Sequence, residues 1–451
     1  MYNRIKVFID KYDVLHHSQY GFRENHSTQH AILDIVNQIQ TNMEFKLFTC
    51  GIFIDLRKAF DTINHAILLK KLQHYGIRGN VNDWFSSYLI GRTQTTQIAD
   101  CISNKEITMT GVPQGSVLGP LLFILYINDI CNSSDKLQFY LFADDTNLLF
   151  ADRSLRKLEN IVNQEISRVQ NWLTANKLSL NIDKSNFIIF HPYQKRLNYN
   201  VNLTVFDHKT NTYNFLEQKD YVRYLGVLID KHLTWKYHIS HIASKISKTI
   251  GVIARLRHFV PTNTLLNIYR SLILPHLLYG IKTWGNAAKK YIEKLTILQK
   301  RVMRLIYFEQ YSSHAVPLFL SANILPFNML YLKSVSNLMH DISNNVAPSN
   351  IRSLFLASDQ VHTHKTRSSV KGNYYVKFSR LNKHKNSFSR TGAKIWNSIP
   401  LQWRKLHKFS FKKILHTRLL QILSEQDNYV ELSVLIKSLT QSYTKIDLCI
   451  S

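Results

Sequence analysis

The chain has 451 residues, of which 45% are hydrophobic and 12% aromatic, and its formal net charge is +27 at pH 7. This apolar content excludes a mostly disordered protein, and the length is sufficient for two to four domains. The excess of Lys and Arg predicts a polyanionic partner whose binding weakens steeply with salt concentration.

No apolar run approaches the roughly 18 residues that cross a bilayer, and the first residues lack the apolar core of a signal peptide. The four cysteines are scattered without a Cys-x-x-Cys pair, which is typical of a reducing compartment and gives no structural zinc site. We therefore expect an intracellular protein, in the nucleus or the cytoplasm, that is neither secreted nor bound to a membrane.

The first 45 residues are predicted to be helical. A short helix precedes the segment Gln-Tyr-Gly-Phe-Arg at 19–23, and a second helix is expected from about Ser27 to Asn42. A buried strand is predicted over residues 48–54, because that run is almost entirely apolar, and Asp55 stands at its carboxyl end.

A helix from roughly Thr62 to Tyr75 is expected after this strand, with Asp61 as its N-cap. The sequence suggests no capping or other structural role for Asp55. Farther along, Pro and Gly at 111–115 predict a tight turn, which leads into an apolar helix that extends to about Ile130.

A hairpin with two acids at its tip is predicted next. Its arms are the apolar runs 137–142 and 146–150, and the turn holds Asp144 and Asp145. No Lys or Arg stands within six residues on either side, so a divalent cation such as Mg²⁺ or Mn²⁺ would relieve the repulsion between these carboxylates. A solvated hairpin turn is the alternative, since Asp is common in turns.

The remainder of the chain is predicted to be mainly helical. A long amphipathic helix is expected over 155–175, a loop or extended hairpin over 191–218, and further helices over 237–253, after Pro261, and over about 287–307. His238 and His241 are expected to be surface or groove polar residues, because no third ligand is spaced to complete a zinc site.

Residues 361–420 contain 15 Lys or Arg and no Asp or Glu, with aromatic residues between them. This pattern suits contacts to a nucleic-acid backbone together with base stacking, and a solvated basic face is the alternative. The segments around Trp396 and Phe411 are predicted to pack into a core.

Six segments resemble, in order, the motifs of reverse transcriptases of non-LTR (LINE, jockey-like) retrotransposons. Phe-Ile-Asp-Leu-Arg-Lys-Ala-Phe-Asp at 53–61, Gly-Val-Pro-Gln-Gly-Ser-Val-Leu-Gly-Pro at 111–120 and Phe-Ala-Asp-Asp at 142–145 resemble palm motifs A, B and C. Residues 19–28 resemble the entry from fingers to palm, 180–185 motif D, and 224–227 the primer-grip hairpin.

The resemblance implies a role for each matching acid and for one lysine. Asp55 and Asp144 match the carboxylates that hold two catalytic Mg²⁺ ions, with Mn²⁺ as a substitute, and Asp145 matches a third acid. Lys184 matches the motif D lysine, which donates a proton to the leaving pyrophosphate or contacts a phosphate.

Four further residues match substrate-binding positions of the family. Phe60 matches the steric gate against a ribose 2′-hydroxyl, although a core role for this ring stays open, and Gln114 and Gly115 match the loop beneath the nascent base pair. Arg23 resembles the arginine of the entry motif. The family's main triphosphate-binding residues lie on finger strands before that motif, and we expect those strands to be missing from an N-terminally truncated chain.

The implied fold is α+β: a right-hand polymerase palm of split βαβ type, with an antiparallel sheet and helices on one face, followed by a mostly α-helical thumb and C-terminal region. The implied domains are residual fingers at 1–45, the palm at 46–230, a helical thumb-like domain at 231–330 and a basic C-terminal region at 331–451.

The resemblance implies an RNA-directed DNA polymerase that transfers nucleotides from dNTPs to the 3′-hydroxyl of a DNA primer on an RNA template. We find no nuclease motif in the sequence, so an endonuclease would be supplied elsewhere. The alternative is a catalytically impaired, nucleic-acid-binding relic of such an element, and a group II intron maturase is a third interpretation.

Overall fold

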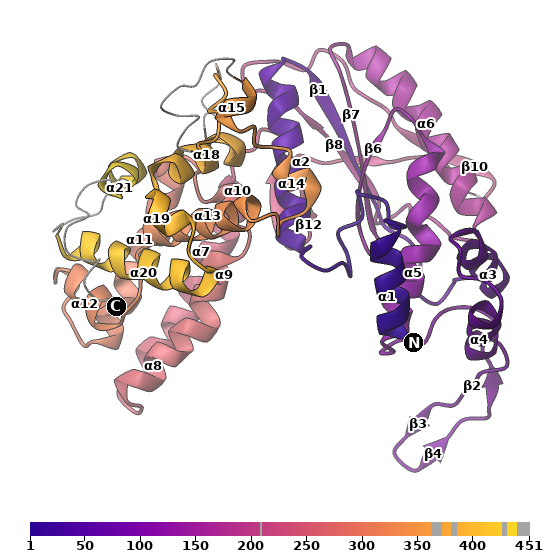
Figure 1. Ribbon diagram of the computed structural model, residues 1–451, viewed down its shortest axis with the longest axis horizontal. Helices are drawn as coiled ribbons and strands as arrows, with labels where there is room; N and C mark the ends of the chain where they lie inside the picture. Colours follow the sequence, from indigo (N-terminus) through magenta and orange to yellow (C-terminus); the bar gives the residue numbers. More distant parts are fainter. Residues whose placement is uncertain (208–209, 362–371, 380–385, 426–430, 440–451) are drawn as a thin grey trace. The chain divides into compact units, whose positions relative to one another are not determined.

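The computed structural model describes residues 1–451 apart from 208–209, 362–371, 380–385, 426–430 and 440–451 (Figure 1). The chain divides into two compact units, one of residues 1–31 and 45–220 and one of residues 32–44 and 221–451. Helix α2 (Thr28–Glu44) contributes residues to both units. The protein is therefore a mixed structure of helices and sheets, as the sequence predicts.

A five-stranded sheet forms the centre of the first unit, in the order β11 (Glu217–Gln218), β8 (Asn186–Phe190), β1 (Phe48–Ile54), β7 (Asp145–Asp152) and β6 (Gln138–Phe142). Neighbours are antiparallel except β11 and β8, which are parallel. β1 has the bounds that its apolar run predicts, and β6 and β7 confirm the predicted hairpin.

One face of this sheet is covered by helices, visible in Figure 1 as α5 (Leu118–Ile127) and α6 (Leu155–Ala175). Alternate residues of β1, namely Phe48, Cys50, Ile52 and Ile54, belong to the same buried apolar core as these helices. α1 (Tyr2–Lys11), α3 (His65–His74) and α4 (Asn80–Leu89) add residues to that core. The strand that leads to Asp55 is therefore part of a large buried core.

Two short ladders form an arm that extends beyond α3 and α4 in Figure 1. β2 (Thr93–Gln94) pairs with β5 (Glu106–Ile107), and β3 (Gln97–Ile98) pairs with β4 (Cys101–Ile102). All eight strand residues are exposed. The sequence did not predict this arm, because strands of two residues have no readable alternation. A further pair, β9 (Thr204–Asp207) and β10 (Thr212–Phe215), lies within the predicted loop or hairpin at 191–218.

The described part of the second unit is mainly helical, and it includes the hairpin of β12 (Tyr221–Tyr224) and β13 (Val227–Asp230). α7 (Lys236–Leu256) buries the isoleucine stripe that its spacing predicts, and Lys245 and Lys248 are exposed. A π-helical turn, η2 (Tyr269–Ile273), joins α8 (Thr262–Ile268) to α9 (Leu274–Leu278). The other helices follow in chain order: α10 (Ile281–Trp284), α11 (Lys289–Ile306), α12 (Val316–Ser321), α13 (Phe327–Ser343), α14 (Ser349–Arg352), α15 (Ser358–Val361), α18 (Phe388–Ser398), α19 (Leu401–Arg404), α20 (Lys408–Ser424) and α21 (Leu432–Ser438).

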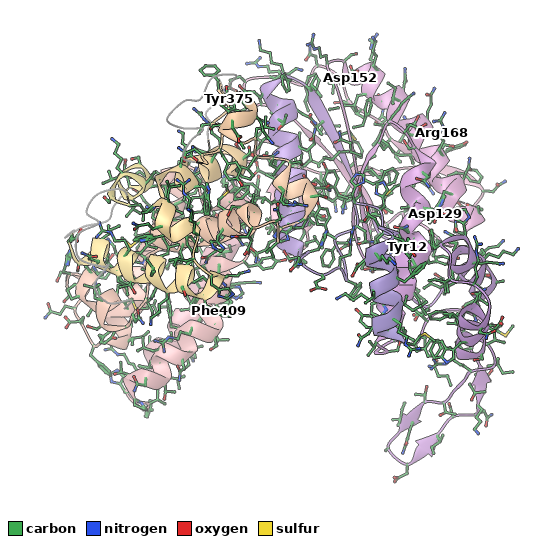
Figure 2. All side chains as sticks on the ribbon, viewed as in Figure 1. Tyr12, Asp129, Asp152, Arg168, Tyr375 and Phe409 are labelled. Carbon is green, nitrogen blue, oxygen red and sulfur yellow. The ribbon has the colours of Figure 1, made fainter. Side chains whose placement is uncertain are left out.

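The C-terminal helices pack around α13, which contacts α10, α18 and α20. Trp396 and Phe411 are buried there, as predicted, so these rings are unavailable for stacking on bases. Phe409, labelled in Figure 2, is instead 76% exposed. Parts of the basic stretch 361–420, namely 362–371 and 380–385, lie outside the described residues.

Three local expectations are wrong. α3 begins at His65, and its N-cap is Asn64, whose side chain accepts a hydrogen bond from the Ile67 N–H (3.1 Å), not Asp61. The apolar helix α5 ends at Ile127, and the next six residues form a 3₁₀ helix, η1 (Asn128–Ser133). His238 is buried against Trp284, with ring centroids 5.2 Å apart, and burial lowers its pKa to about 4.

No helix in the described part of the chain is long and apolar enough to cross a membrane.

The sheet core makes a direct prediction about stability. Ile52 lies in the central strand β1 and is fully buried, so Ile52→Ala is expected to lower the free energy of unfolding by about 2–5 kcal/mol in urea denaturation. Ile98→Ala is the matched control, because Ile98 is 75% exposed on the arm and its loss should change stability by no more than about 0.5 kcal/mol. Equal losses in the two variants would contradict the assigned core.

Candidate active site

The turn between β6 and β7 presents two of the predicted acids. Phe142 pairs with Asp145, so Ala143 and Asp144 are the two central residues of the hairpin turn. Ala143 has φ +54°, whereas Asp144 has no positive φ, as in a type II′ turn. Asp144 and Asp145 are both exposed at this turn. The local chain geometry thus places both carboxylates at one end of the sheet.

Asp55 lies at the same end. The ladder between β1 and β7 ends with Ile54 opposite Thr146, so Asp55 and Asp145 are the next residues at this end of the two strands, and the charge of Asp55 acts on Asp145. The structure therefore brings together the three acids that the sequence singled out from two distant segments.

These carboxylates repel one another. Asp145 reaches solvent, yet partial desolvation by its neighbours, together with the charges of Asp144 and Asp55, raises its pKa to about 6. Within the described part of the chain, no salt bridge to Lys, Arg or His involves any of the three. The site has excess negative charge that its described protein neighbours do not neutralise.

The donor set suits a hard divalent cation, since carboxylate oxygens are the ligands that Mg²⁺ and Mn²⁺ prefer. Among the described residues, no three His, Cys, Asp or Glu side chains are already gathered in the arrangement of a metal centre. The positions of the acids on adjacent strands make them neighbours, and their charges act on one another.

The segment that follows α6 holds Asp55 in place. Asn181 Nδ2 donates a hydrogen bond to Asp55 Oδ2 (2.8 Å), and the Asn181 N–H donates to the Asp55 carbonyl (2.8 Å). The Asp55 N–H donates to Ser185 Oγ (3.1 Å), and that hydroxyl donates to the Asn181 carbonyl (2.7 Å). Sequence reasoning did not single out Asn181, although it lies inside the motif D segment.

Lys184 lies in the turn between Asn181 and β8, and its side chain is exposed. Its carbonyl accepts a hydrogen bond from Asn186 Nδ2 (3.0 Å). The lysine therefore lies on the same short loop as the residues that hold Asp55.

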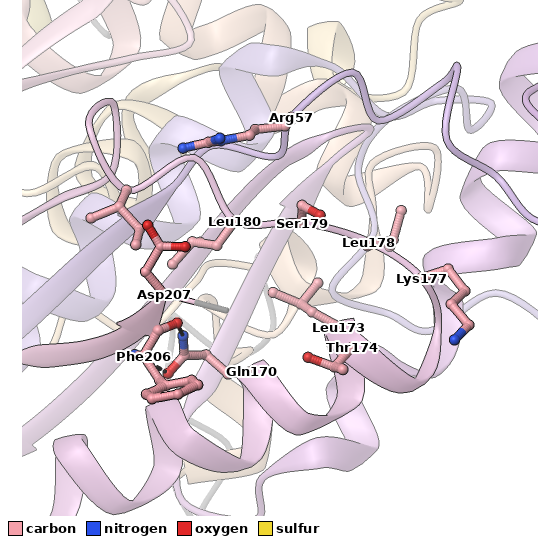
Figure 3. A pocket seen from close by; sticks show the side chains of 11 residues that line it. Arg57, Gln170, Leu173, Thr174, Lys177, Leu178, Ser179, Leu180, Phe206 and Asp207 are labelled. Atoms are coloured by element: carbon pink, nitrogen blue, oxygen red, sulfur yellow. Dashed lines mark hydrogen bonds between the residues drawn. The ribbon is translucent and has the colours of Figure 1, made fainter. Parts of the chain in front are cut away.

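The cavity in Figure 3, of about 310 Å³, is lined in part by Leu180 and Ile182 of the motif D segment, and Asp55, Asp144 and Asp145 do not line it. Leu173 and Leu178 line it, together with Arg57. The Arg57 N–H donates to the Ser179 carbonyl (2.9 Å), which ties the residues after Asp55 to the cavity wall. The cavity therefore lies next to the segment that holds Asp55 in place.

Gln114 and Gly115 are exposed on the turn before α5. Gln114 Nε2 donates to Asp61 Oδ1 (2.8 Å), so Asp61 orients this amide and does not cap a helix. Gly111 has φ +87°, and a Cβ there would lie 2.8 Å from the Asp61 carbonyl oxygen. Gly115 has φ +78° with open space around it, so its conformation requires glycine while its packing does not.

Phe60 is half-buried, and its ring stacks on Phe123 of α5 with centroids 4.4 Å apart. The predicted core contact of this ring is therefore confirmed, and its role as a steric gate stays a prediction.

Arg23 is tied to its own loop. Its Nη1 donates to the His16 carbonyl (3.0 Å), and its Nη2 lies 3.8 Å from Asp13 Oδ1. The side chain is only 18% exposed, and burial lowers the pKa of its guanidinium. These contacts give Arg23 a structural role in holding residues 13–23.

Comparison with known proteins yields a family and several relatives. Residues 1–229 match the family model described as reverse transcriptase (RNA-dependent DNA polymerase). The chain is 28% identical over 321 residues to the "Probable RNA-directed DNA polymerase from transposon X-element" of Drosophila melanogaster, covering 67% of this chain and 33% of that protein. It is 27% identical over 322 residues to the "RNA-directed DNA polymerase from mobile element jockey" of the same organism, with the same coverage.

The chain thus spans about a third of the length of the curated relatives it matches. Among solved structures, apo telomerase from Candida tropicalis matches 73% of this chain and 53% of its own, at 12% identity and a TM-score of 0.39.

The raised pKa of Asp145 predicts a pH-dependent stability. Its ordinary value is 3.8, so the folded state is destabilised once pH rises through the interval from about 4 to 6 and the carboxylate ionises beside its neighbours. Asp145→Asn should therefore raise Tm at pH 8 in EDTA, and the gain should vanish below about pH 4. Asp100→Asn, at an exposed acid on the arm, is the control and should show no such gain. An equal Tm for Asp145→Asn and the parent chain at pH 8 would contradict the repulsion.

Proposed function

The chain belongs to the reverse transcriptase (RNA-dependent DNA polymerase) family, and from this membership we propose that it extends the 3′-hydroxyl of a DNA primer with dNTPs on an RNA template. The observation that carries the proposal is the meeting of Asp55 with the Asp144–Asp145 turn at the end of one sheet. Nucleotidyl transfer needs such a group of acids, because they can hold the divalent cations that neutralise its polyanionic substrates.

When bound, two Mg²⁺ or Mn²⁺ ions would activate the primer hydroxyl and neutralise charge on the departing pyrophosphate. Asp55 and Asp144 are the residues we assign to hold them, with Asp145 as the third acid. Asn181 keeps the Asp55 carboxylate in one orientation through its 2.8 Å hydrogen bond. Lys184, exposed on the adjoining loop, is suited to contact a phosphate oxygen or to transfer a proton to pyrophosphate.

We assign the neighbouring residues to the substrate. Gln114 and Gly115 lie on an exposed turn where a nucleotide can approach the backbone. Asp61 accepts a hydrogen bond from the Gln114 amide and orients it. Phe60, supported by Phe123, would exclude a ribose 2′-hydroxyl. Arg23, predicted as a substrate ligand, is better suited to supporting its own loop.

In this proposal residues 1–45 are residual fingers, residues 46–230 are the palm and include the sheet of the first unit, and the helices at 231–330 are the thumb. These bounds differ from the division into two units, because residues 32–44 and 221–230 belong to the second unit. Lys245 and Lys248 lie exposed on α7, opposite its buried isoleucines, where they suit the phosphates of a template–primer duplex. The region at 331–451 adds further positive charge.

Primer extension on poly(rA)/oligo(dT) tests the reaction. The protein is expected to extend oligo(dT) with dTTP in Mg²⁺ or Mn²⁺, and Asp144→Asn should lower kcat by at least about 100-fold, because losing a metal ligand costs more than losing its supporting partner. Asp100→Asn, at an exposed acid on the arm, is the matched control and should keep full activity. Template binding without extension at any concentration of either metal would instead select the catalytically impaired relic.

Selection of the sugar is tested separately. Phe60→Val should lower the ratio of kcat/KM for dTTP over UTP by about tenfold or more, because the smaller side chain leaves room for a 2′-hydroxyl. Phe45→Val, at a ring that is 62% exposed, should leave this ratio unchanged. A ratio unaffected by Phe60→Val would remove this residue from the site.

A further inference from the structure

The turn that carries Asp144 has a backbone that needs external support. Ala143 occupies φ +54°, which is uncommon for a residue with a Cβ, and it is buried although the acids beside it are exposed. Such a conformation persists only where the surrounding structure fixes it. The neighbours of Ala143 therefore decide where Asp144 points.

The support for this turn comes from a segment that is far away in the sequence. The Leu141 N–H donates to the Ser18 carbonyl (2.9 Å), and the Tyr20 N–H donates to the Leu141 carbonyl (2.8 Å). Gln19 thus forms a parallel bridge with Leu141, beside the outer strand β6. This short segment extends the sheet next to the turn.

Gln19 reaches into the turn itself. Its side chain is fully buried, and Oε1 accepts hydrogen bonds from the Gly21 N–H (2.7 Å) and the Ala143 N–H (3.2 Å). Nε2 has no hydrogen-bond partner in the described part of the chain, so these two bonds are what the amide contributes. One oxygen atom therefore joins the entry segment to the turn.

Gly21 allows this contact. A Cβ at Gly21 would lie 2.5 Å from the Ala143 nitrogen, closer than real Cβ atoms approach, so any other residue would displace the turn. The opposite end of the segment is fixed as well: the His16 N–H donates to Asn128 Oδ1 (2.7 Å), and Asn128 Nδ2 donates to the Val14 carbonyl (2.8 Å). The segment is thus anchored to η1 at one end and to the turn at the other.

We propose that Gln19 is a positioning residue for the catalytic turn, which acts through the Ala143 N–H to hold Asp144 where it can share a divalent cation with Asp55. The inference rests on the proposed function, because the reaction gives this geometry its purpose. Gly21 serves the same turn by leaving room for it.

Gln19→Met tests the inference, because it keeps length and burial but removes the acceptor. Mn²⁺ binding to the full chain, followed by electron paramagnetic resonance without nucleic acid, should weaken about tenfold, as for other partners that orient a metal ligand. Hydrogen–deuterium exchange should rise in the peptide that contains Ala143. In primer extension, kcat should fall by about tenfold, whereas KM for dTTP and the affinity for template–primer should stay within about twofold.

Gln299→Met is the matched control. Gln299 is also a buried glutamine, but its Nε2 donates to Tyr269 Oη (2.9 Å) and the Leu325 carbonyl (3.0 Å) in the second unit. Its loss should lower Tm without changing Mn²⁺ affinity. A general loss of stability therefore cannot account for an effect confined to Gln19→Met.

A second pair of variants tests the inference independently, in case Gln19→Met does not fold. Gly21→Ala should displace the same turn and weaken Mn²⁺ binding in the same direction, whereas Gly251→Ala, where a Cβ meets nothing within 4 Å, should not. Unchanged Mn²⁺ affinity and unchanged kcat in both Gln19→Met and Gly21→Ala would overturn the inference. A parent chain that binds Mn²⁺ but extends no primer would overturn the proposed function alone, since the binding measurement needs no catalysis.

Discussion

Three carboxylates that repel one another are held at one end of a single sheet. The strand pairing and the buried hydrogen bonds of the first unit must overcome this repulsion. Asp55 follows the central strand β1, and Asp144 and Asp145 occupy the neighbouring hairpin turn. Left to themselves, like charges would move apart or bind protons, and the pKa of Asp145 is raised to about 6 by partial desolvation and by the other two acids. Backbone pairing and buried hydrogen bonds maintain the arrangement, and a divalent cation would relieve it.

Two different supports oppose this repulsion. Asn181 and Ser185 fix the side chain and the backbone of Asp55, and Gln19 fixes the backbone beside Asp144. β1 itself is paired on both edges, with β7 and β8, while its core face packs with α5 and α6. Asp152, labelled in Figure 2, ends β7 opposite Phe48, far along the strand from the turn. Asp55 thus follows a strand that is paired on both of its edges.

Much of this arrangement could be predicted from the sequence, because continuous apolar runs fix β1 and the β6–β7 hairpin, and a clear helical period fixes α6. The supports could not be predicted. Asn181 and Asp55 are 126 residues apart, and Gln19 and Ala143 are 124 apart, so no local pattern connects them. Asp61 was assigned as a cap because Asp suits that position, but Asn64 caps the helix and Asp61 binds Gln114. The spacing of His238 likewise gave no sign of its burial.

The central claim is that Asp55, Asp144 and Asp145 together bind a divalent cation. Crystals of the protein soaked in Mn²⁺ above pH 7, where Asp145 is ionised, would test it through anomalous scattering. The account predicts an anomalous peak coordinated by Asp55 and Asp144, with Asp145 beside it. Strong Mn²⁺ peaks only at other residues, or Asp55 turned away from an occupied Asp144–Asp145 turn, would contradict the account.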